Sequence, residues 1–296
     1  MTRAVVSVPL MSVVVPVWNG EAVIRRCLDA LSRQTIDRAR YDIIVVDNGS
    51  SDRTADIVRE YPDITLLAEL TPGSYAARNT AIAAAGATLI AFTDADCVPA
   101  PDWLEAGLAA AAANPDFGVL AGQIDLFEEG APGARVYADY ERLFSFPQVH
   151  AARGNCATAN WISRAEVLRA LGGFDAALKS GGDRQMALRI RDAGHPLIYV
   201  PQMVVRHPVR ADRAELVRKR RRLSGGRWDR TRDAPRLARV LGVTAVDTLR
   251  RLRRAAVSPG FSFGQRLAMM RLTLSLASVA TGEFVRLARG HKAARD

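Results

Sequence analysis

The chain has 296 residues and a mass of 32.1 kDa, enough to bury a sizeable core in one large domain or two smaller ones. Hydrophobic residues make up 49% and charged residues 24%, which is ordinary for a folded soluble protein and is not the composition of a disordered one. The chain does not start with a basic segment followed by an apolar stretch and a small-residue cleavage site. We therefore expect no secretory signal.

The net charge of +10 is distributed unevenly along the chain. Residues 206–296 hold 23 of the 41 basic side chains and 7 of the 31 acidic ones, a balance of +16. The remaining 18 basic and 24 acidic side chains give residues 1–205 a balance of −6. A mildly acidic body with a basic C-terminal region predicts an anionic partner for that region, either a membrane surface or nucleic acid.

The three cysteines, Cys27, Cys97 and Cys156, are far apart, odd in number and without the spacing of a zinc site. We expect reduced thiols and hence a cytoplasmic protein. Peripheral attachment to the inner face of a membrane is compatible with this expectation.

The first 114 residues alternate four times between an apolar strand pattern and a helical pattern. The expected strands lie within residues 12–20, 41–52, 63–70 and 87–96, and the expected helices within residues 21–34, 53–61, 74–86 and 102–114. Strands that are apolar throughout and alternate with helices predict a parallel sheet covered on both faces. Ligands bind such sheets outside the carboxyl ends of the strands, where this sequence places its polar residues.

The middle of the chain, residues 118–208, is less regular and predicts mixed strands and helices that complete the same domain. Arginine-rich helices are expected in residues 211–223, 236–257 and 263–290. In the second of these, one helical face is expected to be apolar and the other basic: Leu241, Ala245, Leu249 and Leu252 against Arg250, Arg251, Arg253 and Arg254. No run has the roughly 20 apolar residues that span a bilayer, since Arg271 interrupts the best candidate.

Two carboxylates, Asp94 and Asp96, follow the fourth expected strand one residue apart. Residues i and i+2 of an extended segment point to the same side, and two nearby carboxylates repel each other by about 1 to 4 kcal/mol. A divalent cation such as Mg²⁺ or Mn²⁺ converts this repulsion into attraction and can also hold a diphosphate. The alternative is that the two residues form a turn and a helix cap before Pro99.

Five segments, taken in chain order, resemble the motifs of the inverting glycosyltransferases of family 2, which have the GT-A fold. They are SVVVPVWNG (12–20), VVDNGSSD (45–52), SYAARNTAI (74–82), FTDADCVP (92–99) and GGD (181–183) before RIRDAG (189–194). The resemblance covers residues 8–208 and implies a GT-A catalytic domain over 1–210, followed by a basic amphipathic helical region over 211–296. It further implies metal-dependent transfer of a hexosyl group from a nucleoside-diphosphate sugar, with a UDP-sugar favoured, to a hydroxyl group with inversion.

The resemblance also implies which residues bind the nucleotide sugar: Pro16, Val17, Trp18, Asn19, Asp47, Arg78, Asp94, Ala95 and Asp96. Trp18 would lie against the base and Asp47 would accept a hydrogen bond from it. The alternatives are simple packing for Trp18, a turn cap for Asp47 and a solvated helix face for Arg78.

The resemblance places Asp183 at the position of the catalytic base, Asp96 as a direct metal ligand and His207 as a residue that completes the metal shell of Mn²⁺ or Mg²⁺. The family often has Glu-Asp where this chain has Gly182 and Asp183. Asp183 as a helix N-cap and His207 as a structural residue are the alternatives. More weakly, the resemblance implies an acceptor and donor-sugar pocket formed by Asn160, Trp161 and Gly182, with Arg164 nearby. The Gln-x-x-Arg-Trp motif of processive members lacks its glutamine, since Ser224 precedes Arg227 and Trp228.

For the basic C-terminal region we expect an anionic membrane surface, and a glycolipid or glycan acceptor would be consistent with it. The alternative is that the region packs on the catalytic body. A nucleic-acid-binding protein would leave Asp94 and Asp96 without a role, so no nucleic acid is expected. A dinucleotide oxidoreductase would carry G-x-G-x-x-G after the first strand, which is absent. A nucleotidyltransferase would use the same metal ligands without needing Asp183, and it remains the nearest enzyme alternative.

Overall fold

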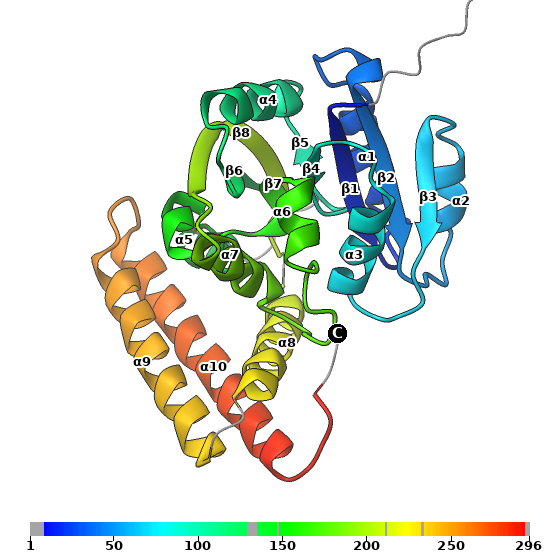
Figure 1. Ribbon diagram of the computed structural model, residues 1–296. Helices are drawn as coiled ribbons and strands as arrows, with labels where there is room; N and C mark the ends of the chain where they lie inside the picture. Colours follow the sequence, from blue (N-terminus) through cyan, green and yellow to red (C-terminus); the bar gives the residue numbers. More distant parts are fainter. Residues whose placement is uncertain (1–8, 129–134, 147, 211, 232–233, 294–296) are drawn as a thin grey trace, which may run out of the picture. The chain divides into compact units, whose positions relative to one another are not determined.

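A computed structural model describes residues 9–128, 135–146, 148–210, 212–231 and 234–293 (Figure 1). The chain divides into two compact units. Unit 1 comprises Met1–Asp125, Phe146–Ala176 and Gly182–His207, and unit 2 comprises Leu126–Ser145, Ala177–Gly181 and Pro208–Asp296. Compared with the predicted division after residue 210, unit 2 takes in two additional segments from the middle of the chain.

Unit 1 is built on a mixed eight-stranded sheet with the order β3-β2-β1-β4-β7-β6-β8-β5 among the described residues. The strands are β1 Met11–Val17, β2 Tyr41–Asp47, β3 Ile64–Ala68, β4 Leu89–Phe92, β5 Val98–Pro99, β6 Val119–Phe127, β7 Trp161–Arg164 and β8 Leu197–Pro208. The first four strands are parallel, whereas β7 is antiparallel to β4 and to β6, and β5 is antiparallel to β8. The predicted α/β fold, a sheet flanked by helices, is confirmed.

The first four helices of unit 1 follow the strands as the sequence pattern predicts: α1 Ile24–Ser32, α2 Thr54–Arg59, α3 Ser74–Ala84 and α4 Trp103–Ala113. Helices α6 Ala165–Ala170 and α7 Gly182–Asp192 lie in the less regular middle of the chain. Helix α1 shows why they form, because its four buried residues recur at helical spacing: Ile24, Cys27, Leu28 and Leu31. The central strand β1 is buried along its whole length, so the core lies on both faces of the sheet.

In register, β1 and β2 run together from Met11 opposite Tyr41 to Val17 opposite Asp47, and β4 pairs with β1 up to Val14 opposite Phe92. The carboxyl ends of β1, β2 and β4 therefore lie at the same edge of the sheet (Figure 1). This edge receives the loops that contain the predicted polar residues.

Unit 2 is formed by helices α5 Arg135–Phe144, α8 Arg213–Arg230, α9 Arg236–Val257 and α10 Phe263–Ala288. Helix α10 packs against the other three (Figure 1). One apolar cluster joins α5, α8 and α10 through Tyr140, Leu216, Leu272 and Leu276. A second cluster joins α9 to α10 through Val240, Ala280, Phe284 and Leu287. Among the helices that the structure describes, none combines the length and the hydropathy of a membrane span.

The four apolar residues expected on one face of residues 236–257 differ in burial. Leu249 is 65% exposed and Ala245 is exposed, whereas Leu241 and Leu252 are half-buried. The buried residues of α9 are Val240, Thr244 and Ala255. Arg251, predicted on the polar face, lies half-buried with its guanidinium carbon 4.9 Å from the centre of the Phe144 ring. An arginine that stacks on an aromatic ring can occupy a packed face, so the real face is rotated from the one that hydrophobicity alone suggests.

Candidate active site

The loops after β1 and β2 hold each other at the carboxyl edge of the sheet in unit 1. Asn19 donates its backbone N–H to Ser50 Oγ and accepts from the Ser51 backbone N–H with its Oδ1, each at 2.8 Å. Asp47, at the end of β2, accepts the Ser50 N–H with its Oδ1 at 3.1 Å, as a turn-capping carboxylate does. The predicted base-binding residues Asn19 and Asp47 therefore lie in one connected loop pair.

Trp18 leaves the sheet where β1 ends. Pro16 and Val17 are buried as the last residues of that strand, whereas Trp18 is 53% exposed. Packing within the described chain does not account for a tryptophan this exposed. Its ring is available to lie against a planar ligand.

Arg78 is buried instead of lying on a solvated helix face. It projects from α3, is 4% exposed, and donates from Nη2 to Asp94 Oδ1 at 2.6 Å. A bond this short between charged groups is a charge-assisted hydrogen bond. The structure therefore brings together two predicted nucleotide-sugar residues, and it gives Asp94 a cationic partner.

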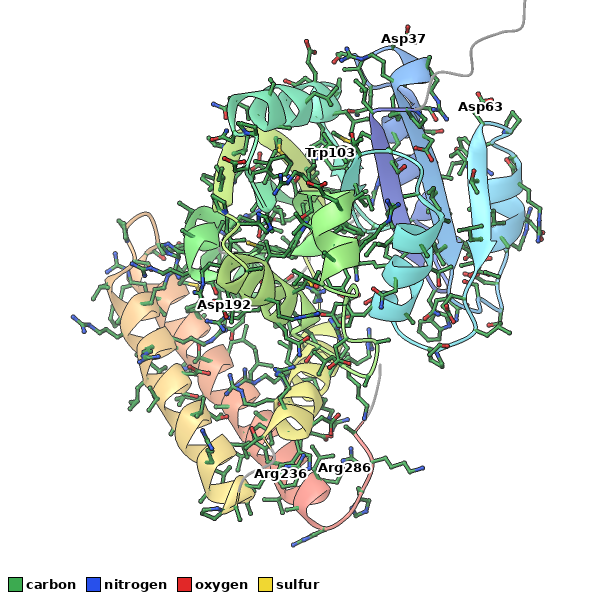
Figure 2. The ribbon with its side chains drawn as sticks, viewed as in Figure 1. Asp37, Asp63, Trp103, Asp192, Arg236 and Arg286 are labelled. Atoms are coloured by element: carbon green, nitrogen blue, oxygen red, sulfur yellow. The ribbon has the colours of Figure 1, made fainter. Side chains whose placement is uncertain are left out.

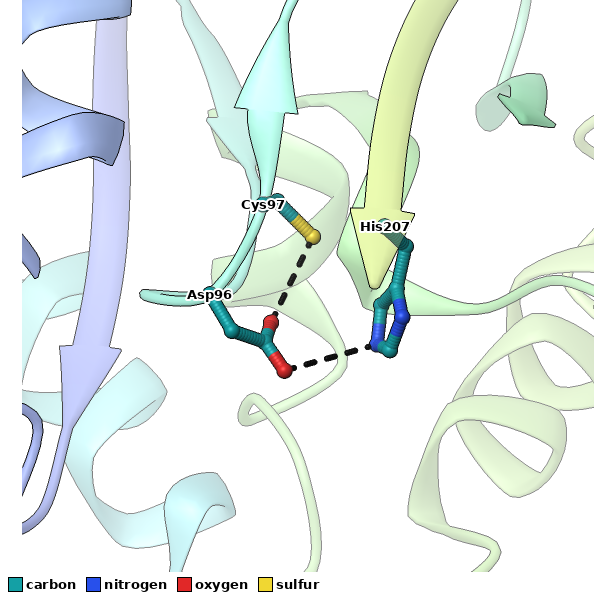
Figure 3. Close-up of side chains that lie close together, drawn as sticks. All are labelled: Asp96, Cys97 and His207. Atoms are coloured by element: carbon teal, nitrogen blue, oxygen red, sulfur yellow. Dashed lines mark hydrogen bonds and ion pairs between the residues drawn. The ribbon is translucent and has the colours of Figure 1, made fainter. Parts of the chain in front are cut away.

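Asp96 lies beside His207 and Cys97 (Figure 3). Asp96 Oδ2 is 3.6 Å from His207 Nε2, and the Cys97 Sγ is 3.6 Å from Asp96 Oδ1. One ligand atom from each of the three residues lies within 4.8 Å of the others. The predicted metal pair, Asp96 and His207, thus comes together although 111 positions separate the two residues in the sequence.

Sequence reasoning did not assign Cys97 to the site. A lone cysteine has no spacing pattern, and its only signal is that it directly follows Asp96. Its thiol is fully buried, and this burial raises its pKa, with the nearby carboxylates of Asp96 and Asp94 adding to the effect. Without a metal ion the group is therefore a neutral thiol.

His207 is the second-to-last residue of β8 and is 4% exposed. The Phe146 ring lies 4.7 Å from the imidazole ring, centre to centre. This packing fixes the plane of the imidazole and directs Nε2 toward Asp96 (Figure 3).

Asp183 is in the first turn of α7, and its side chain does not cap that helix. Oδ2 accepts the backbone N–H of Thr158 from another segment at 3.3 Å, and the buried Oδ1 has no partner among the described residues. The residue retains some exposed surface, but its carboxyl group is enclosed. Burial raises the pKa of Asp183, the nearby Arg78 opposes this shift, and Asp94 adds to it.

Three residues of the weakly predicted pocket are packed into the structure. Asn160 and Trp161 are fully buried. Asn160 accepts from Nε1 of the buried Trp103 at 2.8 Å, deep among the side chains of unit 1 (Figure 2). Gly182 is buried against Tyr75, where an added Cβ would lie 2.6 Å from the Tyr75 ring. None of the three offers an open side-chain surface in this structure.

Arg164 is separated from the other predicted residues. It is opposite Leu89 at the amino end of β4, whereas Asp94 follows the carboxyl end of that strand. Its Nη2 contacts His195 Nδ1 at 2.9 Å. Because β7 is antiparallel to β4, its last residue, Arg164, lies beside the amino end of β4, away from the site.

The arrangement at this edge is chemically specific. It combines an exposed aromatic ring, a carboxylate and imidazole pair suited to a divalent cation, a buried arginine, and a carboxylate with a raised pKa.

Comparison with known proteins identifies the family of this chain. The family model described as "Glycosyl transferase family 2" matches residues 12–171. Glycosyltransferase AglE of Haloferax volcanii is 33% identical over 226 residues, which cover 74% of this chain and 73% of that protein. The pre-mycofactocin glycosyltransferase of Mycobacterium tuberculosis (H37Rv) is 32% identical over 210 residues, covering 67% of this chain but only 42% of that protein.

Solved structures share the fold. The mannosyltransferase PcManGT from Pyrobaculum calidifontis, in complex with GDP-Man and Mn²⁺, superposes with a TM-score of 0.64 at 24% identity, covering 92% of this chain and 87% of that one. The S. aureus TarS fragment 1–349 in complex with UDP-GlcNAc gives a TM-score of 0.56 at 16% identity, with coverages of 95% and 92%. With the matched family model and the extended similarity to AglE, these findings lead to one conclusion: this chain belongs to glycosyltransferase family 2.

Proposed function

We propose that this chain is a metal-dependent inverting glycosyltransferase, which moves a hexosyl group from a nucleoside-diphosphate sugar to a hydroxyl acceptor. The observation that carries the proposal is the approach of His207 Nε2 to Asp96 Oδ2, 3.6 Å apart at the carboxyl edge of the sheet. Two residues so distant in sequence have no local reason to meet there.

The donor set is suitable for Mn²⁺ or Mg²⁺. Carboxylate oxygen and imidazole nitrogen are ligands of Mn²⁺, and an open coordination shell can take the oxygens of a diphosphate. Asp96 and His207 would hold the ion, and Cys97 is the third candidate donor. When bound, the ion would supply neutralisation of the charge that develops on the departing diphosphate. A fold neighbour, PcManGT, is in complex with Mn²⁺, which supports this assignment.

The loops beside this metal pair would bind the nucleotide. Trp18 offers an exposed ring for the base, and Asp47 retains a second carboxylate oxygen beyond the one that accepts the Ser50 N–H. Asp94 and Arg78 would orient the ribose and phosphate region as a preformed ion pair. Pro16, Val17, Asn19 and Ala95 contribute the backbone that shapes this binding site.

Asp183 would be the catalytic base. As the acceptor oxygen attacks the anomeric carbon, the bond from that carbon to the diphosphate oxygen breaks, and the hydroxyl proton passes to the Asp183 carboxylate. Attack from the face opposite the leaving diphosphate inverts the configuration at that carbon. The raised pKa of Asp183 makes its carboxylate a stronger base than an exposed aspartate, which favours this role.

The donor class is supported by the ligands of fold neighbours, and the acceptor class by the charge of the C-terminal region. The family resemblance favours a UDP-sugar, and fold neighbours are in complex with GDP-Man and with UDP-GlcNAc, so a donor screen should include both UDP- and GDP-sugars. A glycolipid or membrane-associated glycan as acceptor, and a peripheral position on an anionic membrane, are supported by the +16 balance of residues 206–296.

The experiment that tests the proposal is the Asp183→Asn variant assayed for transfer and for nucleotide binding. We expect glycosyl transfer to fall about 10²- to 10⁴-fold, because the amide cannot accept the proton. Binding of UDP with Mn²⁺, followed by thermal shift, should be unchanged.

The matched control is Asp63→Asn, an exposed aspartate just before β3, at the end of the sheet remote from the site (Figure 2). Unaltered turnover in Asp183→Asn would contradict the proposal and favour a nucleotidyltransferase, which needs the metal pair and no base at this position.

A further inference from the structure

A stripe of side chains on α9 is left uncovered by the fold. The residues follow one another at alternating steps of three and four, which places them along one side of a helix: Val243, Val246, Arg250, Arg253 and Val257. Leu249, three residues after Val246, flanks them. We call these six residues the α9 stripe. Its four apolar members are between 45% and 68% exposed, and both arginines are exposed.

The stripe has no part in holding unit 2 together. The opposite side of α9 already packs on α10, where Val240 joins the cluster of Ala280, Phe284 and Leu287 (Figure 1). No hydrogen bond or ion pair links Arg250 or Arg253 to another residue in the part of the chain that the structure describes. Four exposed large apolar residues on one helix side therefore point to something outside the chain.

The charge around the stripe specifies an anionic partner. Residues 236–293 contain eleven arginines and lysines and only two acids, Asp247 and Glu283. Both acids are already paired, Asp247 with Arg227 at 2.7 Å and Glu283 with Arg286 at 2.6 Å. A second copy of this face would carry the same positive charge and would be repelled.

The combination of apolar residues with arginines in the α9 stripe favours a lipid surface over a nucleic acid as the anionic partner. A nucleic acid backbone would engage Arg250 and Arg253 but would give the four apolar residues no apolar environment. At a bilayer, apolar side chains enter the boundary between headgroups and acyl chains, while arginines extend to the phosphates.

We propose that the α9 stripe is the face by which this chain docks on an anionic membrane. The inference deepens the membrane association proposed above and rests on it, but it does not depend on the catalytic assignment. It identifies which of the many basic residues of unit 2 contact lipid, and it adds the apolar residues that enter the interface.

The test is flotation of the full chain with vesicles of phosphatidylcholine alone and of phosphatidylcholine mixed with phosphatidylglycerol. Arg250→Gln/Arg253→Gln should lower the partition coefficient on anionic vesicles about 30-fold. Each arginine near an anionic surface contributes about 1 kcal/mol, and about 1.4 kcal/mol corresponds to a factor of ten. Val246→Ser/Leu249→Ser should lower it about tenfold through lost apolar burial. All four side chains are exposed, so neither variant should unfold the chain.

The matched control is Arg33→Gln/Arg59→Gln in unit 1, which removes the same charge from residues whose side chains are 76% and 64% exposed. It should float like the unaltered chain. Transfer to a water-soluble acceptor should be the same for all of these variants, so that catalysis and docking are scored separately.

Three results would overturn the inference in distinguishable ways. If the chain floats and both stripe variants float equally well, the membrane association stands and the assigned face is wrong. If the chain does not float even at low salt, the association itself fails, while the catalytic proposal is unaffected. If sedimentation shows a dimer that Val246→Ser/Leu249→Ser dissociates, without any flotation, the stripe is an interface between copies.

Discussion

The carboxyl group of Asp183 lies in an environment that opposes its charge. Its Oδ1 is buried without a partner among the described residues, and burial raises its pKa. A buried carboxylate oxygen without a hydrogen-bond partner lowers the stability of the folded state, so a purely structural role does not explain this environment. The same environment suits a general base, because a raised pKa increases the affinity of the carboxylate for the acceptor proton.

This raised pKa predicts a pH dependence. Asp183 must be ionised to accept a proton, so kcat/KM should fall as the pH falls through its pKa. Because that pKa lies above the ordinary value of 3.8, the acid limb should lie at higher pH than an exposed aspartate would give. The measurement is a kcat/KM profile, with UDP binding recorded over the same range as the control. A limb at the ordinary aspartate value would contradict the account.

Arg78 and Cys97 show what the sequence could and could not reveal about single residues. Arg78 was predicted from the resemblance, and the structure brings it to Asp94 at 2.6 Å. Cys97 was missed, because its only relation to His207 is spatial. The resemblance implied that Asn160 and Trp161 line a pocket, yet both are completely buried, and this burial depends on packing against Trp103 and other distant residues. Burial of this kind is set by tertiary contacts, which no local pattern encodes.

Among the elements, those of the first half of unit 1 were predictable and those of the second half were not. Strands β1 to β4 with their helices combine long apolar runs with clear helical periodicity. The antiparallel strands β5, β7 and β8 are paired with segments far away in sequence, and β5 has only two residues. The row of arginines expected on α9 is not uniform, because Arg251 is half-buried against Phe144. Its arginines could not be sorted into buried and exposed ones by charge alone.

Helix α5 carries a buried ionic group that holds unit 2 together. Glu141 is 1% exposed and accepts from Lys219 Nζ at 2.7 Å and from Arg210 Nη1 at 3.0 Å. These cations lower the pKa of Glu141 to about 2 despite its burial. Burial lowers the pKa of Lys219 to about 8, and the positive charge of the neighbouring Arg210 adds to this effect.

We therefore predict that Glu141→Gln lowers the free energy of unfolding by about 3 kcal/mol, since it leaves the half-buried Arg210 and Lys219 without their shared counter-charge. Urea denaturation is the measurement. Glu128→Gln, which removes an exposed partner of Arg142, should change it by less than about 1 kcal/mol. Because the folded pKa is lowered, the contribution of Glu141 is present above about pH 4.5 and should be lost as the pH falls toward about 2. A loss no greater than that of the Glu128 variant would refute this role.

At the scale of the whole molecule, the charge is divided unevenly along the chain. Residues 1–205, with a balance of −6, contain the predicted catalytic residues apart from His207, while residues 206–296 carry +16. The family and the fold class were predictable from the sequence because five motifs keep their order. The composition of unit 2 was not, because segments 126–145 and 177–181 join it only through packing.

The central claim is that Asp96 and His207 together hold a divalent ion, and a Mn²⁺ titration followed by electron paramagnetic resonance in the presence of UDP tests it most directly. Asp96→Asn and His207→Asn should each weaken Mn²⁺ binding at least about tenfold, as expected when a ligand atom is lost. The control variant Asp63→Asn should bind Mn²⁺ like the unaltered chain. Equal Mn²⁺ affinity in all four proteins would contradict the claim.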